Sequence, residues 1–203
     1  MKILCIGRNY RDHIKELNSP MPQAPVFFLK PDTSLLIRNR PFYYPGFSKE
    51  IHYEAELVLK ISKTGKSIGK NFAHSYYEEI GIGIDFTARD IQENCKQNGL
   101  PWTVAKGFDQ AAPIGKFLPK SNFRSLSDIS FHLDLNEKTV QQGNSGEMMF
   151  SFDDIISYIS GFITLRSGDL IFTGTPSGVG PVKIGDKLEA YIEGEKLLQC
   201  LIK

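Results

Sequence analysis

Two glutamates two residues apart, in the segment IHYEAELVLKI at residues 51–61, form the first group in this chain that could do chemistry. Apolar residues alternate there with the ionisable residues His52, Glu54 and Glu56. Alternation is the period of a half-buried strand, so the three ionisable side chains share one face. The Cα atoms of the two glutamates are then about 6.6 Å apart. Their carboxylates can converge on one point, where they repel each other unless a cation or a proton lies between them.

A second strand, IGIGIDF at residues 80–86, supplies a third carboxylate, that of Asp85. Two glycines share its face, which suggests the close approach of a ligand or of another backbone. If the two strands are neighbours, the three carboxylates would form an open, all-oxygen site suited to Mg²⁺ or Mn²⁺. His52 would then lie beside the site rather than in it. The residues alone leave a solvated strand face as the alternative.

His13 and Glu16 are three residues apart in a segment, residues 9–18, that we expect to form a helix begun by Asn9. Side chains at this spacing lie on one helix face. A carboxylate beside an imidazole makes a general base that can deprotonate water. The alternative for this pair is a surface ion pair.

Three cations and one loop could bind an anionic substrate. Lys106, four residues after the only tryptophan, could stabilise an enolate if it is partly buried. Lys30 in FFLKP and Arg89 after the second strand could hold a carboxylate. The loop in LIFTGTPSGVGPV, residues 170–182, is rich in glycine and proline, and its amides and the Thr175 hydroxyl could face an anion.

Composition excludes several classes of protein. The 203 residues are 41% hydrophobic and 23% charged, with a net charge of +1, which gives no electrostatic reason to expect nucleic acid or an anionic membrane as a partner. There is no Walker loop, no G-x-S-x-G and no C-x-x-C, which argues against a nucleotide-binding P-loop, a serine hydrolase and a zinc site. The three cysteines are far apart and read as buried, reduced thiols. With no signal-peptide core or membrane span in the sequence, a cytoplasmic location is expected.

The elements that must position these residues are mostly short strands. Helices are expected only at residues 9–18, 74–80, 87–98 and 151–161, the last two started by capping patterns. Strands without regular alternation with helices predict an α+β, mostly β fold, a sandwich or roll with peripheral helices.

Six motifs in order, GRNYRDHIKE, FFLKP, HYEAEL, IDFTARDIQ, GLPWTVAKGFD and LIFTGTPSGVGPV, resemble the fumarylacetoacetate hydrolase family, most closely its small acylpyruvase and oxaloacetate decarboxylase branch. The resemblance implies one catalytic domain over residues 1–203, a mixed β-sandwich roll, a homodimer and one divalent metal, Mg²⁺ or Mn²⁺. It also implies that residues 9–18 form a lid over the substrate.

Carried over position by position, the resemblance gives each candidate residue a role. The metal ligands would be Glu54, Glu56 and Asp85; the catalytic residues His13, Glu16 and Lys106; and the substrate-binding residues Lys30, Arg89, Gln92 and Thr175.

The expected activity is Mg²⁺-dependent C–C hydrolysis of a 2,4-diketo acid such as acetylpyruvate or fumarylpyruvate. The alternatives are an oxaloacetate decarboxylase or tautomerase, an isomerase or decarboxylase of muconate derivatives from aromatic catabolism, and a non-enzymatic module with a structural cation. We expect a small keto or diketo acid as the ligand, and neither nucleic acid nor a membrane as a partner.

Overall fold

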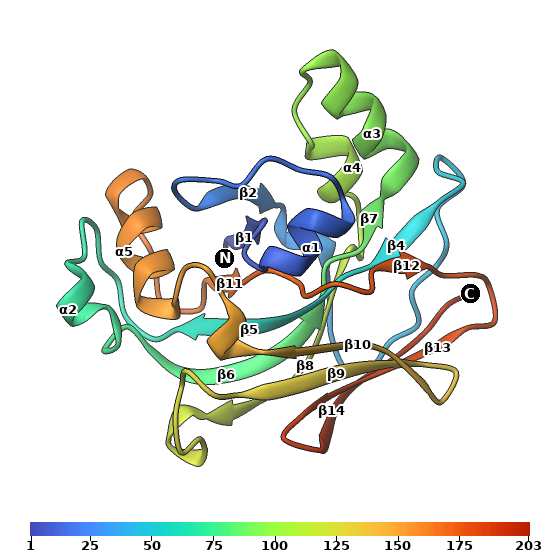
Figure 1. The fold of residues 1–203 in the computed structure, drawn as a ribbon. Helices are drawn as coiled ribbons and strands as arrows, with labels where there is room; N and C mark the ends of the chain where they lie inside the picture. The colour runs from blue at the N-terminus through green and yellow to red at the C-terminus, as the bar shows by residue number, and fades with distance from the viewer.

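Most of the regular structure is β-strand, in a computed structural model that describes residues 1–203 (Figure 1). The strands are β1 (Ile3–Gly7), β2 (Val26–Lys30), β3 (Leu35–Leu36), β4 (Ile51–Tyr53), β5 (Ala55–Ile61), β6 (Tyr77–Ile84), β7 (Thr87–Ala88), β8 (Ala112–Pro119), β9 (Ser130–Leu135), β10 (Lys138–Asn144), β11 (Leu170–Phe172), β12 (Gly180–Pro181), β13 (Lys187–Ile192) and β14 (Glu195–Leu201). The helices are α1 (Arg11–Glu16), α2 (Lys70–Ala73), α3 (Arg89–Asn98), α4 (Thr103–Lys106) and α5 (Phe152–Phe162), with 3-10 turns at Asp32–Ser34, Lys120–Asn122 and Ser145–Glu147.

The strands form three sheets. A seven-stranded sheet has the order β2-β1-β11-β5-β6-β8-β3, a four-stranded sheet the order β10-β9-β13-β14, and a three-stranded sheet the order β12-β4-β7. The pairs β1–β11 and β3–β8 are parallel and the other pairs antiparallel, so the sheets are mixed. The predicted fold class, a mixed β-sandwich roll with peripheral helices, is confirmed.

The hydrophobic core lies between the two larger sheets. In Figure 1 the four-stranded sheet lies below β5 and β6, and β13 contacts β6 while β14 contacts β8. Leu57 and Leu59 point into this core, whereas Val58 packs with Phe172 on the other face. Both faces of β5 are therefore buried, and each large apolar side chain on it contributes about 1.5–3 kcal/mol of hydrophobic stabilisation. One core shared by both sheets supports the proposal that residues 1–203 form a single domain.

The glycines of β6 allow a close approach, as expected, and the groups that approach them belong to other strands of the fold. A Cβ at Gly83 would lie 2.6 Å from the ring of Phe172 and 3.0 Å from the carbonyl oxygen of Pro113. Pro113 lies on the adjacent strand β8, and Phe172 lies on β11, on the far side of β5. Gly83 is needed for sheet packing, and no ligand has to be invoked.

The predicted strand over residues 51–61 is interrupted at Glu54. Before the break, β4 pairs with β7 and β12 in the three-stranded sheet; after it, β5 pairs with β6 in the large sheet. The two sheets diverge here, and the carbonyl of Glu54 accepts a hydrogen bond from the Asp85 amide at 2.8 Å. The first glutamate thus lies at the junction of two sheets, next to the end of β6.

The sequence predicted that Asn9 caps the first helix, and this prediction is wrong. The residue before α1 is Tyr10, and no side chain caps this end. Asn9 is fully buried, and its amide instead donates to the carbonyls of Phe150 and Thr173 and accepts from the Phe150 amide. Tertiary bonds to two distant segments outweigh the local capping geometry.

The other predicted helices have mixed outcomes. The prediction of a helix at residues 74–80 is wrong. Helix α2 ends at Ala73, and the buried Tyr77 begins β6. Thr87 lies in β7 and the residue before α3 is Ala88, so this helix begins one residue later than its capping pattern indicated. Ser151 forms the predicted cap of α5, with Asp154 completing a capping box.

The three cysteines are buried and unpaired, as the sequence predicted. None of the helices combines the length and the apolar composition needed to cross a bilayer.

Candidate metal centre and active-site pocket

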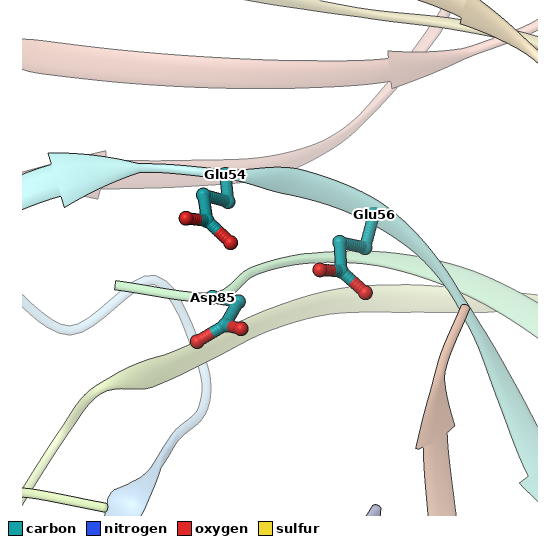
Figure 2. A group of neighbouring side chains, drawn as sticks. All are labelled: Glu54, Glu56 and Asp85. Atoms are coloured by element: carbon teal, nitrogen blue, oxygen red, sulfur yellow. The ribbon is translucent and has the colours of Figure 1, made fainter. Parts of the chain in front are cut away.

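Three buried carboxylates meet at the end of the β5–β6 pair. Glu54 precedes β5, Glu56 lies on it and Asp85 directly follows β6, while Glu56 faces Gly83 across the ladder. The carboxylate oxygens of the three residues lie within 4.8 Å of one another, and each residue is at most 5% exposed. Figure 2 shows the three side chains turned toward a common space. The solvated strand face is therefore excluded as an account of these residues.

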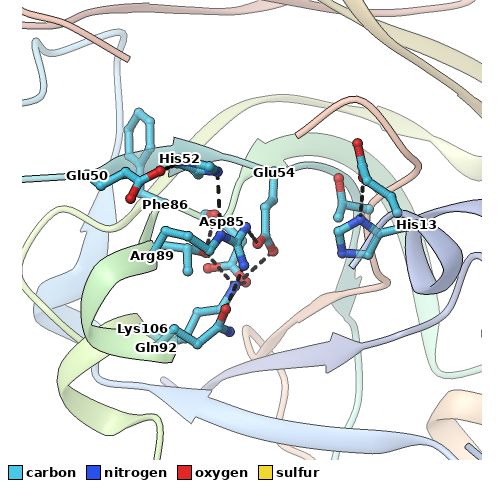
Figure 3. Close-up of polar contacts among 12 residues, drawn as sticks. His13, Glu50, His52, Glu54, Asp85, Phe86, Arg89, Gln92 and Lys106 are labelled. Atoms are coloured by element: carbon cyan, nitrogen blue, oxygen red, sulfur yellow. Dashed lines mark hydrogen bonds and ion pairs between the residues drawn. The ribbon is translucent and has the colours of Figure 1, made fainter. Parts of the chain in front are cut away.

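Two of the carboxylates are paired with buried cations. Lys106 Nζ donates to Glu54 Oε2 and to Asp85 Oδ2, both at 2.8 Å. Arg89 Nη2 donates to Glu54 Oε1 at 2.6 Å, and Figure 3 shows Glu54 between Arg89 and His13. Burial alone would raise the pKa of Glu54, but Lys106 and Arg89 more than offset it and hold that pKa below its usual range. Burial likewise disfavours the charged Lys106, yet the two carboxylates raise its pKa.

Glu56 is buried without a cation. Its only hydrogen-bond partner is the amide of Gly174, which donates to Oε2 at 2.6 Å. Burial raises its pKa well above the usual value, and the negative charges of Asp85 and Glu54 raise it further. A carboxylate in this position is stabilised by a nearby cation, so the all-oxygen group of three carboxylates fits a hard divalent metal.

Helix α1 places His13, the residue predicted to act as a base, at the same pocket. His13 is 5% exposed, and its Nδ1 lies 3.0 Å from Glu16 Oε2. A carboxylate only accepts hydrogen bonds, so this contact keeps the proton of the neutral imidazole on Nδ1 and leaves Nε2 free to accept one. This buried imidazole is unlike the surface ion pair that was the alternative.

Thr175 lies in the loop between β11 and β12, as predicted. Its hydroxyl accepts a hydrogen bond from Gln141 Nε2 at 2.9 Å, and Gln141 Oε1 in turn accepts from the Ala55 amide. Gln141 thus joins the loop to the start of β5. No sequence motif pointed to Gln141, because it acts through residues far from it in the chain.

Lys30 is placed differently from the other candidate substrate residues. Its Nζ donates to the carbonyls of Phe86, Ala111 and Lys106 and lies 2.7 Å from Asp85 Oδ1. It does not line the pocket beside the carboxylates. The geometry assigns it to holding Asp85 in place. His52 contacts Glu50 and Arg89 rather than the carboxylate group.

Most of the candidate site residues line one pocket. It has a free volume of about 30 Å³, and its lining includes the three carboxylates together with His13, Arg89, Gln92, Lys106 and Thr175. Gln92 accepts a hydrogen bond from Arg89 Nη1. The wall also contains residues that the motifs did not single out for a role: Ile6, Gly7, Arg8, Leu17, Ser19, Phe28, Lys96 and Trp102. Arg8 lies 94 residues before Trp102 in the chain, so no local sequence signal joins these residues.

This fold is that of a known family of β-roll proteins. The chain belongs to the fumarylacetoacetate (FAA) hydrolase C-terminal family, which its residues 2–201 match. It is 42% identical to a mitochondrial oxaloacetate tautomerase of Mus musculus over 99% of this chain and 91% of the relative. It is 43% identical to a mitochondrial oxaloacetate decarboxylase of Dictyostelium discoideum over 95% of this chain and 89% of the relative.

Solved structures give the same family and a wider range of activities. The fumarylpyruvate hydrolase of Pseudomonas aeruginosa, in complex with Mn²⁺ and pyruvate, superposes with a TM-score of 0.94 at 33% identity, covering 100% of this chain and 89% of that one. The 5-carboxymethyl-2-hydroxymuconate delta-isomerase of Mycobacterium smegmatis superposes with a TM-score of 0.86 at 30% identity, covering 99% and 78%. The relatives are enzymes, and the oxaloacetate enzymes among them favour the tautomerase and decarboxylase alternative over the hydrolase expectation.

Proposed function

We propose that this chain is a metal-dependent enzyme that interconverts the enol and keto forms of oxaloacetate. The observation that carries the proposal is that His13 and Lys106, one able to move a proton and the other to stabilise an oxyanion, line one pocket at the three buried carboxylates. The 42% identity to an oxaloacetate tautomerase over nearly the whole chain supports the choice of substrate.

The metal would be held by Glu54, Glu56 and Asp85. The observation that favours a metal is that the buried carboxylate of Glu56 has no cation beside it, whereas Glu54 is paired with Arg89 and Lys106. Oxygen donors suit Mg²⁺ or Mn²⁺. When bound there, the metal supplies positive charge that stabilises an enolate.

Tautomerisation moves one proton between the third carbon of oxaloacetate and the oxygen on its second carbon. His13, with its Nδ1 proton directed to Glu16, accepts the proton of carbon 3 on Nε2 and then gives it to the enolate oxygen on carbon 2. In the opposite direction it takes the hydroxyl proton of the enol and gives it to carbon 3. The Lys106 ammonium faces the carboxylate group and donates a hydrogen bond to the oxygen on carbon 2, where negative charge develops. Arg89, Gln92 and Thr175 line the same pocket and hold the substrate carboxylate.

Decarboxylation of oxaloacetate is a second outcome of the same site. The carbon 3–carbon 4 bond breaks, its electron pair forms the enolate of pyruvate, and carbon dioxide leaves. Lys106 stabilises this enolate as it does in tautomerisation, and no water-activating base is required. The identity to the Dictyostelium decarboxylase supports this as a side reaction.

Hydrolysis of an acylpyruvate is the second candidate function. The buried His13–Glu16 pair favours it, because such a pair can deprotonate a water that attacks the acyl carbonyl. The carbon–carbon bond then breaks, releasing a carboxylic acid and the enolate of pyruvate. The similarity to a fumarylpyruvate hydrolase points to the same reaction.

Three substrates separate these functions: oxaloacetate, acetylpyruvate and fumarylpyruvate, each assayed with Mg²⁺ and with EDTA. We expect rapid loss of the enol absorbance of oxaloacetate, slower formation of pyruvate from it, and little cleavage of the acylpyruvates. His13→Ala should abolish the acceleration of enol loss, whereas His74→Ala, at an exposed histidine outside the pocket, should not. Full tautomerase activity in His13→Ala, or in the presence of EDTA, would show that the proposal is wrong.

The homodimer and the cytoplasmic location remain proposals. The dimer rests on the family resemblance, and equilibrium sedimentation tests it. The location rests on three reduced thiols, while the mouse and Dictyostelium relatives are named as mitochondrial. Cell fractionation decides between the two compartments.

A further inference from the structure

Two cations in the wall of the pocket have no anionic partner. Arg8 and Lys96 line it, yet the side chain of neither one forms a hydrogen bond or an ion pair within the chain. The other three cations near the carboxylates, Lys30, Lys106 and Arg89, are each paired with Glu54 or Asp85. Two positive charges are thus available to something that the chain itself does not supply.

Both charges are gathered at one aromatic ring. Arg8 Cζ lies 6.0 Å and Lys96 Nζ 5.9 Å from the ring centroid of Trp102. A cation at this distance is attracted and oriented by the indole face but keeps its charge. Burial lowers the pKa of Lys96, and the charges of Arg89 and Arg8 lower it further. Each cation therefore raises the positive potential at the other.

The backbone at Arg8 is held in an uncommon conformation. Its φ is 62°, in the left-handed region that favours glycine, whereas the neighbouring Gly7 has no positive φ. Strain of this kind persists where the surrounding structure imposes it, and it is concentrated at ligand-binding sites. Glycine would adopt this backbone conformation without strain, yet the chain has an arginine here. This favours a functional role for the Arg8 guanidinium.

Arg8, Lys96 and Trp102 also mark the boundary between two spaces. Besides the pocket at the carboxylates, they line an outer groove of about 530 Å³ that continues past Leu17 and Leu100. A substrate whose keto-acid end lies at the carboxylates would extend its other end toward this boundary.

We propose that Arg8 and Lys96, oriented by Trp102, form a second carboxylate-binding subsite that selects dicarboxylic keto acids over monocarboxylic ones. The inference rests on the proposed function, in which the 2-keto acid group lies at the metal ligands. It names the substrate class of that site: keto acids with a second carboxylate at the far end, as in oxaloacetate. Two cations suit a carboxylate well, since charge-assisted hydrogen bonds are about twice as strong as neutral ones.

A matched pair of keto acids tests the subsite without turnover. 2-Oxoglutarate and 2-oxovalerate have five carbons each and differ in the distal carboxylate. Calorimetry with the Mg²⁺-loaded protein should give at least about tenfold tighter binding of 2-oxoglutarate. Arg8→Gln and Lys96→Gln should each reduce this ratio, and the double variant should bring it near one, with less than about twofold change for 2-oxovalerate. Arg11→Gln, at an exposed cation of α1 outside both spaces, is the control and should leave the ratio unchanged.

Several outcomes would overturn the subsite. Equal or undetectable binding of the two keto acids by the unmodified protein would do so. So would a ratio that survives in the double variant, or an equal weakening of both ligands. The proposed function is tested separately, by the tautomerase assay. If the variants lose the binding ratio but the unmodified protein does not tautomerise oxaloacetate, the subsite is supported and the proposed function is wrong. If the protein tautomerises oxaloacetate but the variants keep the ratio, the proposed function is supported and the subsite is wrong.

Discussion

Gly178 donates its backbone N–H to Glu16 Oε1 at 2.9 Å, while Oε2 of the same carboxylate lies 3.0 Å from His13 Nδ1. One side chain of α1 therefore connects the proposed base to the loop between β11 and β12. The same loop donates from the Gly174 amide to the metal-ligand candidate Glu56. The pocket beside these residues has a free volume of about 30 Å³, and we propose that α1 moves aside when a keto acid enters. In this proposal the Glu16–Gly178 contact re-forms when α1 closes, and it then orients His13.

Glu16→Gln should lower kcat for oxaloacetate tautomerisation by about 10²–10⁴-fold, the contribution typical of a general base. An amide can still accept from Gly178, but its NH₂ group then faces His13 Nδ1. That favours the imidazole tautomer with its proton on Nε2, which cannot accept another. Steady-state rates at several pH values measure the effect. Asp12→Asn, at an exposed acid of the same helix paired with Lys15, is the control. An unchanged rate in Glu16→Gln would exclude the orienting role.

Gly178→Ala should lower both stability and kcat, whereas Gly185→Ala should lower stability alone. Both glycines have positive φ, +95° and +98°, and alanine in this region costs about 1–2 kcal/mol. A Cβ at position 178 would also lie 2.4 Å from the Val140 carbonyl oxygen, while at position 185 it would meet nothing within 4 Å. Urea unfolding and steady-state kinetics compare the two variants. Equal kcat values in both would mean that the loop position does not affect the base.

The carboxylate group could be predicted because it depends on strand periodicity. Alternation put Glu54 and Glu56 on one face, and the antiparallel register that pairs Ala55 with Ile84 brings Asp85 beside them. That pairing follows from two adjacent, strongly patterned segments. The interruption at Glu54 could not be predicted, since it arises where two sheets diverge and not from any feature of the local sequence.

Residues that act across long sequence separations escaped prediction. Asn9 looks like a helix cap, but its partners are 141 and 164 residues away. Arg8 and Lys96 look like ordinary surface cations until the fold places both at Trp102. Local propensity carries no information about such contacts, because it records only what the neighbours in the chain favour.

Glu56→Gln should stabilise the metal-free protein by about 1–3 kcal/mol, the cost of burying a polar group without a matching partner. The buried carboxylate has no cation, and a neutral amide removes that cost. The same change should weaken Mg²⁺ binding, so Mg²⁺ should stabilise the unmodified protein and have little effect on the variant. Chemical unfolding with EDTA and with Mg²⁺ measures both effects. Glu79→Gln, at a partly exposed glutamate paired with Lys60, is the control. Equal stabilisation of both proteins by Mg²⁺ would argue against a metal at Glu56.

Asp90→Asn should destabilise the protein by about 1 kcal/mol at pH 7 and by progressively less as the solution is acidified. Burial disfavours the charged Asp90, but hydrogen bonds from the Lys49 amide, the Ser48 hydroxyl and the Ile91 amide outweigh it and lower its pKa. A lowered pKa in the folded state means that the carboxylate stabilises the fold above the unfolded value of 3.8. That contribution is lost as pH falls through the lower folded value.

The asparagine does not titrate, so the difference between the two proteins should be constant from about pH 7 to 5 and shrink below that. Urea unfolding of both proteins at several pH values between 3 and 7 measures it. The destabilisation at neutral pH follows because an amide NH₂ cannot accept the hydrogen bond from Lys49. A difference that is independent of pH would show that the ionised carboxylate makes no special contribution to joining residues 48–49 to the start of α3.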